Sequence, residues 1–425
     1  MSEIAGKAQE HFFINCFYPP SSLCQGFDRE SVPGTGSFNG LHPKTNSLAV
    51  PSWKRPCDAA LPRTVVLRDY GACFKDEGPV ACLQLSWRKA AATLRATFAH
   101  ERMNMQHFSF SSIPVWVAAM LAACPWVRAQ ESIMVMEAYS GKVLIASNAS
   151  TKRPVASLTK IATGAVAVDW AIATGADLGT LQITVPETVT LVGGPNPMNL
   201  QPGERLSMRD ALYSALLGSD NLAALTIADH VGREILIRRG KPGDPVGEFV
   251  AEMNRLAKAL GMTQTRFANP HGLERRRAPA FSTAADVARM SVYAMRRNAF
   301  SFIVRQPERQ ISVSGPAGKR TYRIRNTNEL IGEPGMLGIK TGTTLAAGPC
   351  LAACMERNPL VRQKADGSKG ATPRRLIVVV LNQPDRFNRA RELIREGWSV
   401  YDSWLDAGAP VQDRQREILS VPNPQ

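Results

Sequence analysis

The chain has 425 residues, 44% of them apolar and 20% charged, an ordinary globular composition that allows two or three domains and a full-sized core. Its formal net charge is +15, but the basic residues are spread along the chain and accompany no nucleic-acid-binding motif, so nucleic acid is not an expected partner. The charge instead favours weak association with an anionic surface, such as a cell wall or lipid headgroups.

Residues 103–129 are predicted to be a secretory signal peptide. An apolar run from Ile113 to Ala123 is followed by Val127-Arg-Ala129, a small-residue cleavage pattern. A run of about 11 apolar residues is shorter than the ~20 that a membrane-spanning helix needs. The prediction places the mature chain in the periplasm or the extracytoplasmic cell envelope.

Residues 1–102 precede this segment and are predicted to be a non-native or disordered extension. They show no sustained helical or strand period, and residues 18–56 are rich in Pro, Gly and Ser. One alternative is a cytoplasmic extension with residues 113–127 as a membrane anchor. Another is lipidation of Cys124, because Leu121-Ala-Ala-Cys124 resembles a lipobox, although Pro125 follows it directly.

Residues 130–406 are predicted to form one folded domain, followed by a short tail at 407–425. The expected elements are a hairpin over 133–145, a helix over 157–174, two helices over 207–231 broken at 218–220, helices over 248–260 and 283–295, strands over 310–313, 336–340, 348–355 and 376–381, a polar loop over 357–374 and a helix over 388–404. This order predicts an α/β fold with two lobes, in which an antiparallel sheet is flanked by helices and carries an inserted helical subdomain.

Only Cys350 and Cys354 fall in this domain, out of eight cysteines in the chain. On one strand, four residues at ~3.3 Å each place them about 13 Å apart, too far for a disulfide. We expect both to be small buried residues.

Three short strings occur in order: Ser157-Leu-Thr-Lys160, Ser219-Asp-Asn221 and Lys340-Thr-Gly342. Singly they mean little, because Ser86-Trp-Arg-Lys89 and Ser37-Phe-Asn39 repeat two of the patterns by chance. Their order, their separations of 62 and 121 residues and the local structure expected at each carry the weight. Together they are the signature of class A β-lactamases and penicillin-binding proteins.

The first string suits nucleophilic catalysis. A lysine three residues after a serine at a helix start brings its amine to the hydroxyl, and a serine becomes a good nucleophile once a base takes its proton. Lys160 must then be neutral, and both burial and a second cation, Lys340, would lower its pKa. The alternative is a capping serine beside a solvated lysine.

The second string lies in a break between helices, where side chains can face a cleft. Ser219 could relay a proton to a departing amine, and the Asn221 amide could hold a substrate carbonyl. Read alone, the same three residues are a common helix N-cap.

The third string ends a strand. An exposed edge strand can bind an extended peptide, and Gly342 would let that peptide approach closely. Lys340 and Thr341 would present a charge and a hydroxyl to a substrate carboxylate. The backbone N–H groups of Ser157 and Thr343 would form an oxyanion hole. This chemistry needs neither a metal nor a cofactor.

From about Glu131 to Trp404 the chain resembles the low-molecular-mass D-alanyl-D-alanine carboxypeptidases, serine peptidases of the penicillin-binding superfamily. Besides the three strings, the resemblance rests on Asn269-Pro-His-Gly-Leu273, Ser282-Thr-Ala-Ala-Asp286-Val-Ala, Asn326-Thr-Asn-Glu-Leu330 and Gly338-Ile-Lys-Thr-Gly-Thr-Thr344 with Ala347-Gly348. It implies a β-lactamase/DD-peptidase-like fold, and peptidoglycan peptides and β-lactams as partners.

The resemblance also implies residue roles. Ser157 would be acylated with Lys160 as its base, Ser219 and Asn221 would form the second element, and Lys340, Thr341 and Gly342 the third. Arg386 matches an arginine that helps to bind the terminal carboxylate, although Arg389 or Arg391 could serve instead.

Two departures from the family pattern stand out. The second string has Asp220 in its middle and Leu222 after it, which leaves substrate preference open. The chain also ends about 20 residues after the catalytic domain, without the family's common C-terminal β-domain and anchor, which favours a soluble or loosely associated enzyme.

The leading functional hypothesis is removal of the terminal D-alanine from peptidoglycan stem peptides. Endopeptidase action on cross-links is the nearest variant. A β-lactamase is the second hypothesis, but the E-x-x-L-N string of class A enzymes does not occur in the sequence. A catalytically silent binder of peptidoglycan or penicillin is a third, from a different class.

Overall fold

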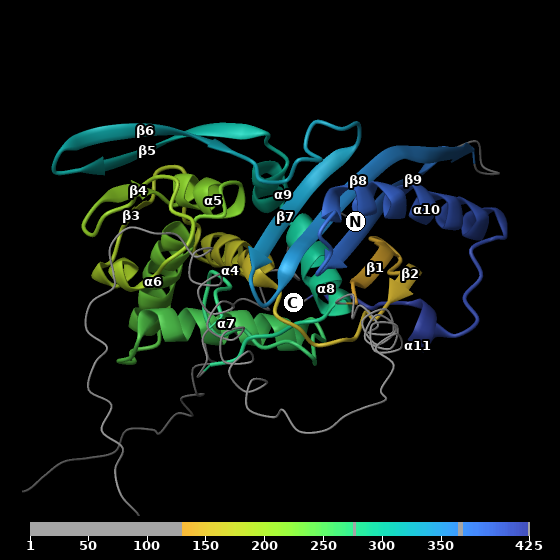
Figure 1. The fold of residues 1–425 in the computed structure, drawn as a ribbon, viewed down its shortest axis with the longest axis horizontal. Helices are drawn as coiled ribbons and strands as arrows, with labels where there is room; N and C mark the ends of the chain where they lie inside the picture. The colour runs from red at the N-terminus through yellow and green to blue at the C-terminus, as the bar shows by residue number, and fades with distance from the viewer. Residues whose placement is uncertain (1–129, 275–277, 364–368, 424–425) are drawn as a thin grey trace, which may run out of the picture. The chain divides into compact units, whose positions relative to one another are not determined.

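The computed structural model describes residues 130–274, 278–363 and 369–423, so the predictions for residues 1–129 lie outside the described residues. A five-stranded antiparallel sheet in the order β2-β1-β9-β8-β7 forms the centre of one lobe (Figure 1). Its strands are β1 (Ser132–Glu137), β2 (Val143–Ser147), β7 (Met336–Thr344), β8 (Gly348–Gln363) and β9 (Lys369–Leu381). β1 and β2 are the hairpin predicted from the sequence, and β7 lies at one edge of the sheet.

The sheet is buried on both faces, which is why its central strands are almost continuously apolar. Along β9, Leu376, Val378 and Val380 face one core, which α10 (Arg386–Asp406) covers with Leu393 and Trp398. The alternate residues Ile377, Val379 and Leu381 face a second and larger core, shared with α8 (Ala284–Met295) and the helical lobe. The period of two therefore divides one apolar run between two cores.

The helical lobe lies between β2 and β7 in the chain. It contains η1 (Ala156–Leu158), α4 (Thr159–Thr174), η2 (Glu187–Leu191), α5 (Met208–Leu216), α6 (Asn221–Arg238), α7 (Pro245–Ala259) and α9 (Asn298–Val304). A small sheet in the order β3-β4-β5-β6 lies beside these helices, with β3 (Gln182–Thr184), β4 (Arg205–Ser207), β5 (Glu308–Gly315) and β6 (Gly318–Arg325).

Helix boundaries follow local sequence signals. Gly175 ends α4 in the left-handed conformation that glycine readily adopts. Asp244 caps α7 by accepting from the backbone N–H groups of Val246 and Gly247, and Pro245 occupies the first turn.

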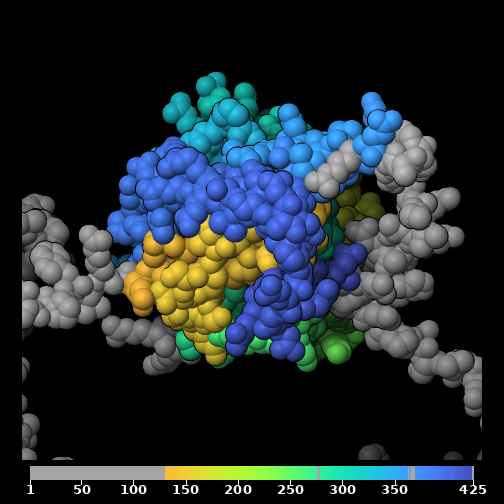
Figure 2. All heavy atoms as spheres, turned by 90° about the vertical axis from the view of Figure 1, so that its right-hand side faces the viewer, coloured from red at the N-terminus to blue at the C-terminus, as the bar shows by residue number. Residues whose placement is uncertain are grey.

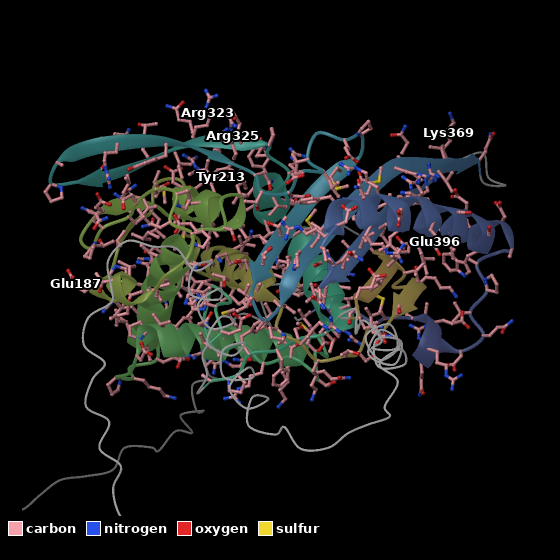
Figure 3. The ribbon with its side chains drawn as sticks, in the orientation of Figure 1. Glu187, Tyr213, Arg323, Arg325, Lys369 and Glu396 are labelled. Carbon is pink, nitrogen blue, oxygen red and sulfur yellow. The ribbon has the colours of Figure 1, made fainter. Side chains whose placement is uncertain are left out.

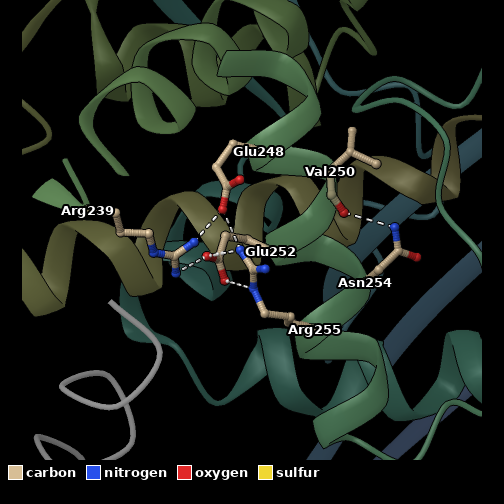
Figure 4. Close-up of polar contacts among 6 residues, drawn as sticks. All are labelled: Arg239, Glu248, Val250, Glu252, Asn254 and Arg255. Atoms are coloured by element: carbon tan, nitrogen blue, oxygen red, sulfur yellow. Dashed lines mark hydrogen bonds and ion pairs between the residues drawn. The ribbon is translucent and has the colours of Figure 1, made fainter. Parts of the chain in front are cut away.

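An ion-pair network joins the end of α6 to α7. Arg239 and Arg255 both contact the carboxylates of Glu248 and Glu252 (Figure 4). On the same helix, the Asn254 side chain exchanges two hydrogen bonds with the backbone of Phe267, at 2.9 and 3.0 Å. These bonds tie α7 to the segment that leads into the loop 269–273.

Two sequence predictions about elements were incomplete or wrong. The predicted polar loop over 357–374 is instead the continuation of β8 and β9, which stay paired as far as Gln363 and Lys369. The side chains of this outer part of the hairpin are mostly polar and exposed, so they gave no apolar strand pattern. β3, β4 and β6 were not predicted from the sequence, and two of them have only three residues.

Cys350 and Cys354 are free and buried, as expected. Burial raises the pKa of the Cys350 thiol to about 11 and that of Cys354 to about 12, so both remain protonated at neutral pH.

The segment after residue 406 packs on the first hairpin. It contains α11 (Arg414–Glu417), and the Leu419 backbone N–H donates to the Gly141 carbonyl at 2.8 Å. In Figure 2 blue atoms of the C-terminal part border the orange and yellow surface of the first described residues. None of the described helices combines the length and the apolarity required to span a bilayer.

Candidate active site

Ser157 lies in η1, immediately before α4, and is partly exposed. Lys160 follows in the first turn of α4 and is fully buried. Its Nζ lies 3.0 Å from Ser157 Oγ. The predicted helix start therefore brings the hydroxyl and the amine into hydrogen-bond contact.

Two further acceptors surround the amine of Lys160. Its Nζ donates to Asn221 Oδ1 at 2.7 Å and to the His271 carbonyl oxygen at 2.8 Å. A neutral amine has two N–H groups and one lone pair. The two acceptors take the two N–H groups, which leaves the lone pair directed at the Ser157 hydroxyl.

The electrostatics favour this neutral form. Burial lowers the pKa of Lys160 well below its ordinary value, and the nearby charge of Lys340 lowers it further, while Asp220 opposes the shift. Both causes expected from the sequence act in the expected direction. The arrangement can therefore remove the proton of Ser157 and produce a nucleophile.

The second string occupies the break predicted between two helices. Ser219 connects α5 to α6 and has φ +60, a left-handed conformation that is uncommon for a residue with a side chain. Asn221 is the first residue of α6, and its Nδ2 donates to the Gly193 carbonyl at 2.8 Å. Both ends of its amide are therefore fixed, so its Oδ1 points at Lys160.

Asp220, the residue that departs from the family pattern, caps α6. Its Oδ1 accepts from the backbone N–H groups of Leu222 and Ala223 at 2.9 and 3.0 Å, and its Oδ2 accepts from Ser214 Oγ at 2.8 Å. The carboxylate is thus used in holding the break between α5 and α6. Within this string Asp220 is the helix N-cap, while Asn221 contacts Lys160.

The third string lies on the edge strand β7, where Lys340 and Thr341 are buried. Lys340 Nζ donates to the Thr341 carbonyl at 3.1 Å, and the hydroxyls of Thr341 and Thr327 are 2.7 Å apart. Burial, together with the charge of Arg386, lowers the pKa of Lys340 to about 7.

Gly342 is where β7 approaches the nucleophile. A Cβ at this position would lie 3.0 Å from the Ser157 backbone nitrogen and 3.1 Å from the Val155 carbonyl oxygen, closer than such contacts normally are. The absence of a side chain at Gly342 therefore lets the backbone of β7 lie against η1. The predicted oxyanion donors, the N–H groups of Ser157 and Thr343, belong to these two segments.

Arg386 is the arginine that the fold brings to the strand. Its Nη1 donates to the Gly342 carbonyl at 2.9 Å and to Thr343 Oγ1 at 2.8 Å. The two alternatives are engaged elsewhere, since Arg389 pairs with Glu131 and Glu392, and Arg391 pairs with Glu333. All nine residues predicted for the site thus come from segments that meet around Ser157 and the end of β7.

The loop 269–273 supplies a contact that residue-by-residue reasoning missed, the His271 carbonyl that fixes Lys160. Asn269 Oδ1 shapes this loop by accepting from the backbone N–H groups of His271 and Gly272 at 3.2 and 2.6 Å. Gly272 has φ +89, and a Cβ there would lie 2.0 Å from the Ala156 carbonyl oxygen. The Asn-Pro-His-Gly-Leu motif indicated that this loop is part of the site. It did not reveal the contact itself, because every residue has a backbone carbonyl. In the described part of the chain, no group of three or more His, Cys, Asp or Glu is arranged to hold a metal ion.

Comparison with known proteins agrees with this geometry. A family model described as D-alanyl-D-alanine carboxypeptidase, peptidase S11, matches residues 119–363. The D-alanyl-D-alanine endopeptidase of Pseudomonas aeruginosa is 32% identical over 236 residues, which are 55% of this chain and 69% of the relative. Carboxypeptidase DacC of Escherichia coli is 30% identical over 308 residues, 70% of this chain and 68% of the relative.

Among solved structures, the Streptomyces K15 DD-transpeptidase is similar to this chain with a TM-score of 0.52 and 25% identity, over 63% of this chain and 96% of that one. The predicted fold class is thereby confirmed. The extent of the family match, together with these relatives, shows that the chain belongs to the peptidase S11 family of D-alanyl-D-alanine carboxypeptidases, which are serine-type hydrolases.

Proposed function

We propose that the protein removes the terminal D-alanine from peptidoglycan stem peptides through an acyl-enzyme on Ser157. The contacts of Lys160 carry this proposal. Its buried amine donates to Asn221 Oδ1 and the His271 carbonyl, and its remaining lone pair faces Ser157 Oγ at 3.0 Å. A lysine in this environment is a base for the serine rather than a surface charge.

In the proposed reaction the substrate lies along the free edge of β7, as an added strand. Its terminal carboxylate binds near Lys340, Thr341, Thr343 and Arg386, where a cation and hydroxyl groups converge. Ser157 Oγ attacks the carbonyl of the D-Ala-D-Ala bond while its proton moves to Lys160 Nζ. The N–H groups of Ser157 and Thr343 stabilise the oxyanion.

Collapse of the tetrahedral intermediate breaks the C–N bond. The departing amine takes a proton, for which Ser219 is the proposed relay from Lys160. D-Alanine leaves and the peptide remains as an ester on Ser157. Water then attacks the ester, Lys160 again accepts a proton, and the shortened peptide is released.

Cleavage of peptide cross-links is the second candidate, because two relatives carry the name D-alanyl-D-alanine endopeptidase, at 32% and 29% identity. Arg386 on Gly342 and Thr343 favours a substrate that ends in a free carboxylate at this point. Purified protein given a pentapeptide and a cross-linked dimer separates the two activities. D-Alanine release from the pentapeptide at the higher kcat/KM supports the first.

We further propose that β-lactams are acyl-enzyme inhibitors of this protein, with slow turnover. Fast hydrolysis of penicillin by the purified protein would instead favour a β-lactamase.

We also propose that the enzyme acts in the cell envelope, with weak association to the wall or membrane surface. Edman sequencing of the mature protein tests the export step, which predicts a new N-terminus near Gln130.

Labelling with a fluorescent penicillin tests the nucleophile. Wild type should be labelled, Ser157→Ala should not, and Ser399→Ala, an exposed serine of α10, should be labelled like wild type. Mass spectrometry of the labelled peptide should place the adduct on Ser157. An unlabelled wild type, or a labelled Ser157→Ala, would contradict the proposal.

A further inference from the structure

A polar cavity lies on the small sheet of the helical lobe, apart from the active site. It has a volume of about 340 Å³ and is lined by residues of β4, β5, β6 and the start of α5. Four cations line it, Arg205, Arg209, Arg309 and Lys319, against one carboxylate, Asp210. None of the predicted catalytic or substrate-binding residues is among its lining residues.

The cavity exists because the sheet opens at this point. β4 and β5 are paired only at Arg205 and Ser314, and the chain turns from β4 directly into α5. Across the gap, Asp210 of α5 accepts from the Ser312 backbone N–H at 3.2 Å. This bond fixes the wall of the cavity and occupies part of its only carboxylate.

Strand register places two cations on either side of one hydroxyl. Ser314 is opposite Arg205 on β4 and opposite Lys319 on β6. Side chains that face each other across neighbouring strands have Cβ atoms about 4.5 to 5.5 Å apart. Arg205, Ser314 and Lys319 therefore form a row in which two like charges are separated only by a serine.

In the described part of the chain these cations differ from their neighbours, because none of them pairs with a carboxylate. Within the described residues, none of the four forms an ion pair within 4.0 Å. The nearby Glu204 is used by Arg320 and by the Gln201 backbone N–H, and Glu308 lies 3.5 and 3.8 Å from Arg323 and Arg325. Like charges without a counter-charge repel one another, and a bound anion would relieve this repulsion.

We propose that this cavity binds a phosphate group, presented either by a soluble phosphate ester or by a lipid headgroup. Arginine forks and a lysine match phosphate oxygens, and the Ser314 hydroxyl adds a neutral donor. The volume is within the range of small-molecule sites, so it accommodates the phosphate and a small attached group. The site is built by β4 and α5, which precede the Ser219 string, and by β5 and β6, which follow it, and its ligand does not take part in the hydrolysis.

The chain offers a matched control for this site. Arg323 and Arg325 are exposed arginines of β6, the strand that carries Lys319. Strand register places both on the face of β6 that also carries Lys319, on the β5-β6 hairpin (Figure 3), but neither of them lines the cavity. The pairs Arg205→Gln/Lys319→Gln and Arg323→Gln/Arg325→Gln remove the same charge from exposed positions, one inside the cavity and one outside it.

The full chain is titrated calorimetrically with glycerol 3-phosphate, and in parallel sedimented with vesicles of phosphatidylglycerol or of phosphatidylcholine. The cavity pair should weaken binding by about tenfold or more, and the control pair should leave it within about twofold. Binding of glycerol 3-phosphate identifies a soluble phosphate ester as the ligand. Binding only to phosphatidylglycerol vesicles, weakened by the cavity pair alone, identifies the lipid source.

The proposal is overturned if neither probe binds wild type, or if both double variants lose binding equally, since the attraction would then be diffuse charge. Penicillin labelling of each variant is measured on the same preparations. Because neither pair belongs to the catalytic machinery, all should label at the wild-type rate. Failure of phosphate binding with normal labelling rejects the cavity alone and leaves the peptidase proposal standing.

Discussion

Lys160 owes its properties to the groups around its amine rather than to its residue type. Two acceptors and one hydroxyl match the hydrogen-bonding capacity of a neutral amine, and full burial disfavours the charged form. The side chain is held in one position by two segments distant in sequence, at Asn221 and His271. Its basicity is therefore a product of the tertiary structure.

Replacing Lys160 tests this directly. Lys160→Met removes the base, and Lys160→Arg keeps a cation that does not lose its proton, so both should lower the rate constant of penicillin acylation by roughly 10² to 10⁴. For wild type the rate should fall toward acid pH, because protonation of Lys160 removes the lone pair. Stopped-flow labelling across the pH range measures both effects. An Arg variant within a few-fold of wild type would show that the position needs only a positive charge.

Lys340 predicts a pH dependence of stability. Its pKa is about 7 in the folded protein and 10.5 ordinarily, so between these values the unfolded chain binds a proton that the folded chain does not. The free energy of unfolding should therefore rise with pH through this window, while below about pH 7 the buried charge lowers it fully. Thermal unfolding of wild type and Lys340→Met at several pH values measures the difference. As the pH rises, the free energy of unfolding should increase more for the wild type than for Lys340→Met. Equal increases would contradict a lowered pKa of Lys340.

At the scale of single residues, the sequence predicted which side chains form the site, but not all of the contacts that position them. Ser157, Lys160, Asn221 and Lys340 are separated in the sequence but meet in the fold, as their strings implied. The choice of Arg386 over Arg389 needed the structure, because three arginines lie within one turn or two of the same helix. The His271 carbonyl could not be identified, since every residue has one.

At the scale of elements, the site depends on close approaches of backbone. The loop 269–273 lies against η1 at Gly272, and β7 lies against η1 at Gly342. Ser157 is therefore held between two segments that approach only because glycine stands at both contacts.

Gly272→Ala should be strongly destabilising and should slow acylation. Its φ of +89 strains any other residue, and its Cβ would overlap the Ala156 carbonyl. Gly408→Ala is the matched control, with φ +85 and nothing within 4 Å of its Cβ. The control should cost about 1 to 3 kcal/mol from backbone strain alone. Urea unfolding should show a larger loss for Gly272→Ala, and the labelling rate should fall only in that variant; equal effects would exclude the steric contact.

Elements with a strong pattern were predicted and short ones were not. The break at residues 218–220 followed from glycine and N-cap signals, and Asp220 indeed caps α6. β3 and β4 have three residues each, too few to show a period of two. The outer residues of β8 and β9 are mostly exposed and polar, so they lack the apolar face on which strand recognition depends.

At the scale of the whole molecule, a buried ion pair links α4 to the segment between α8 and α9. Asp169 of α4 accepts from Arg297 Nε at 2.5 Å and from the Tyr293 hydroxyl at 2.6 Å, and all three residues are buried. Asp169 lies 128 positions from Arg297 and 124 from Tyr293 in sequence, so the pair closes a large part of the fold.

Asp169→Ala should lower the free energy of unfolding by roughly 3 to 5 kcal/mol, because it leaves Arg297 buried without its counter-charge. The double variant Asp169→Ala/Arg297→Met removes both charges and should recover a substantial part of this loss. Chemical unfolding of the two single variants and the double variant gives the coupling energy. Additive losses would show that the two side chains do not interact.

The edge position of β7 affects how the protein behaves in concentrated solution. Among the described residues, β7 has β8 as its one strand partner, whereas Lys142, just before β2 at the opposite edge, is bridged by Ile418 of the C-terminal segment. An uncovered edge strand is a template for pairing with another chain and a starting point for aggregation. The irregularity in the pairing of β7 lies between Met336 and Gly338, before the part of the edge where the peptide is proposed to bind, so it does not protect that part. Occupation of the site by a covalent penicillin should therefore act as a solubility factor, protecting the native protein from edge-to-edge aggregation.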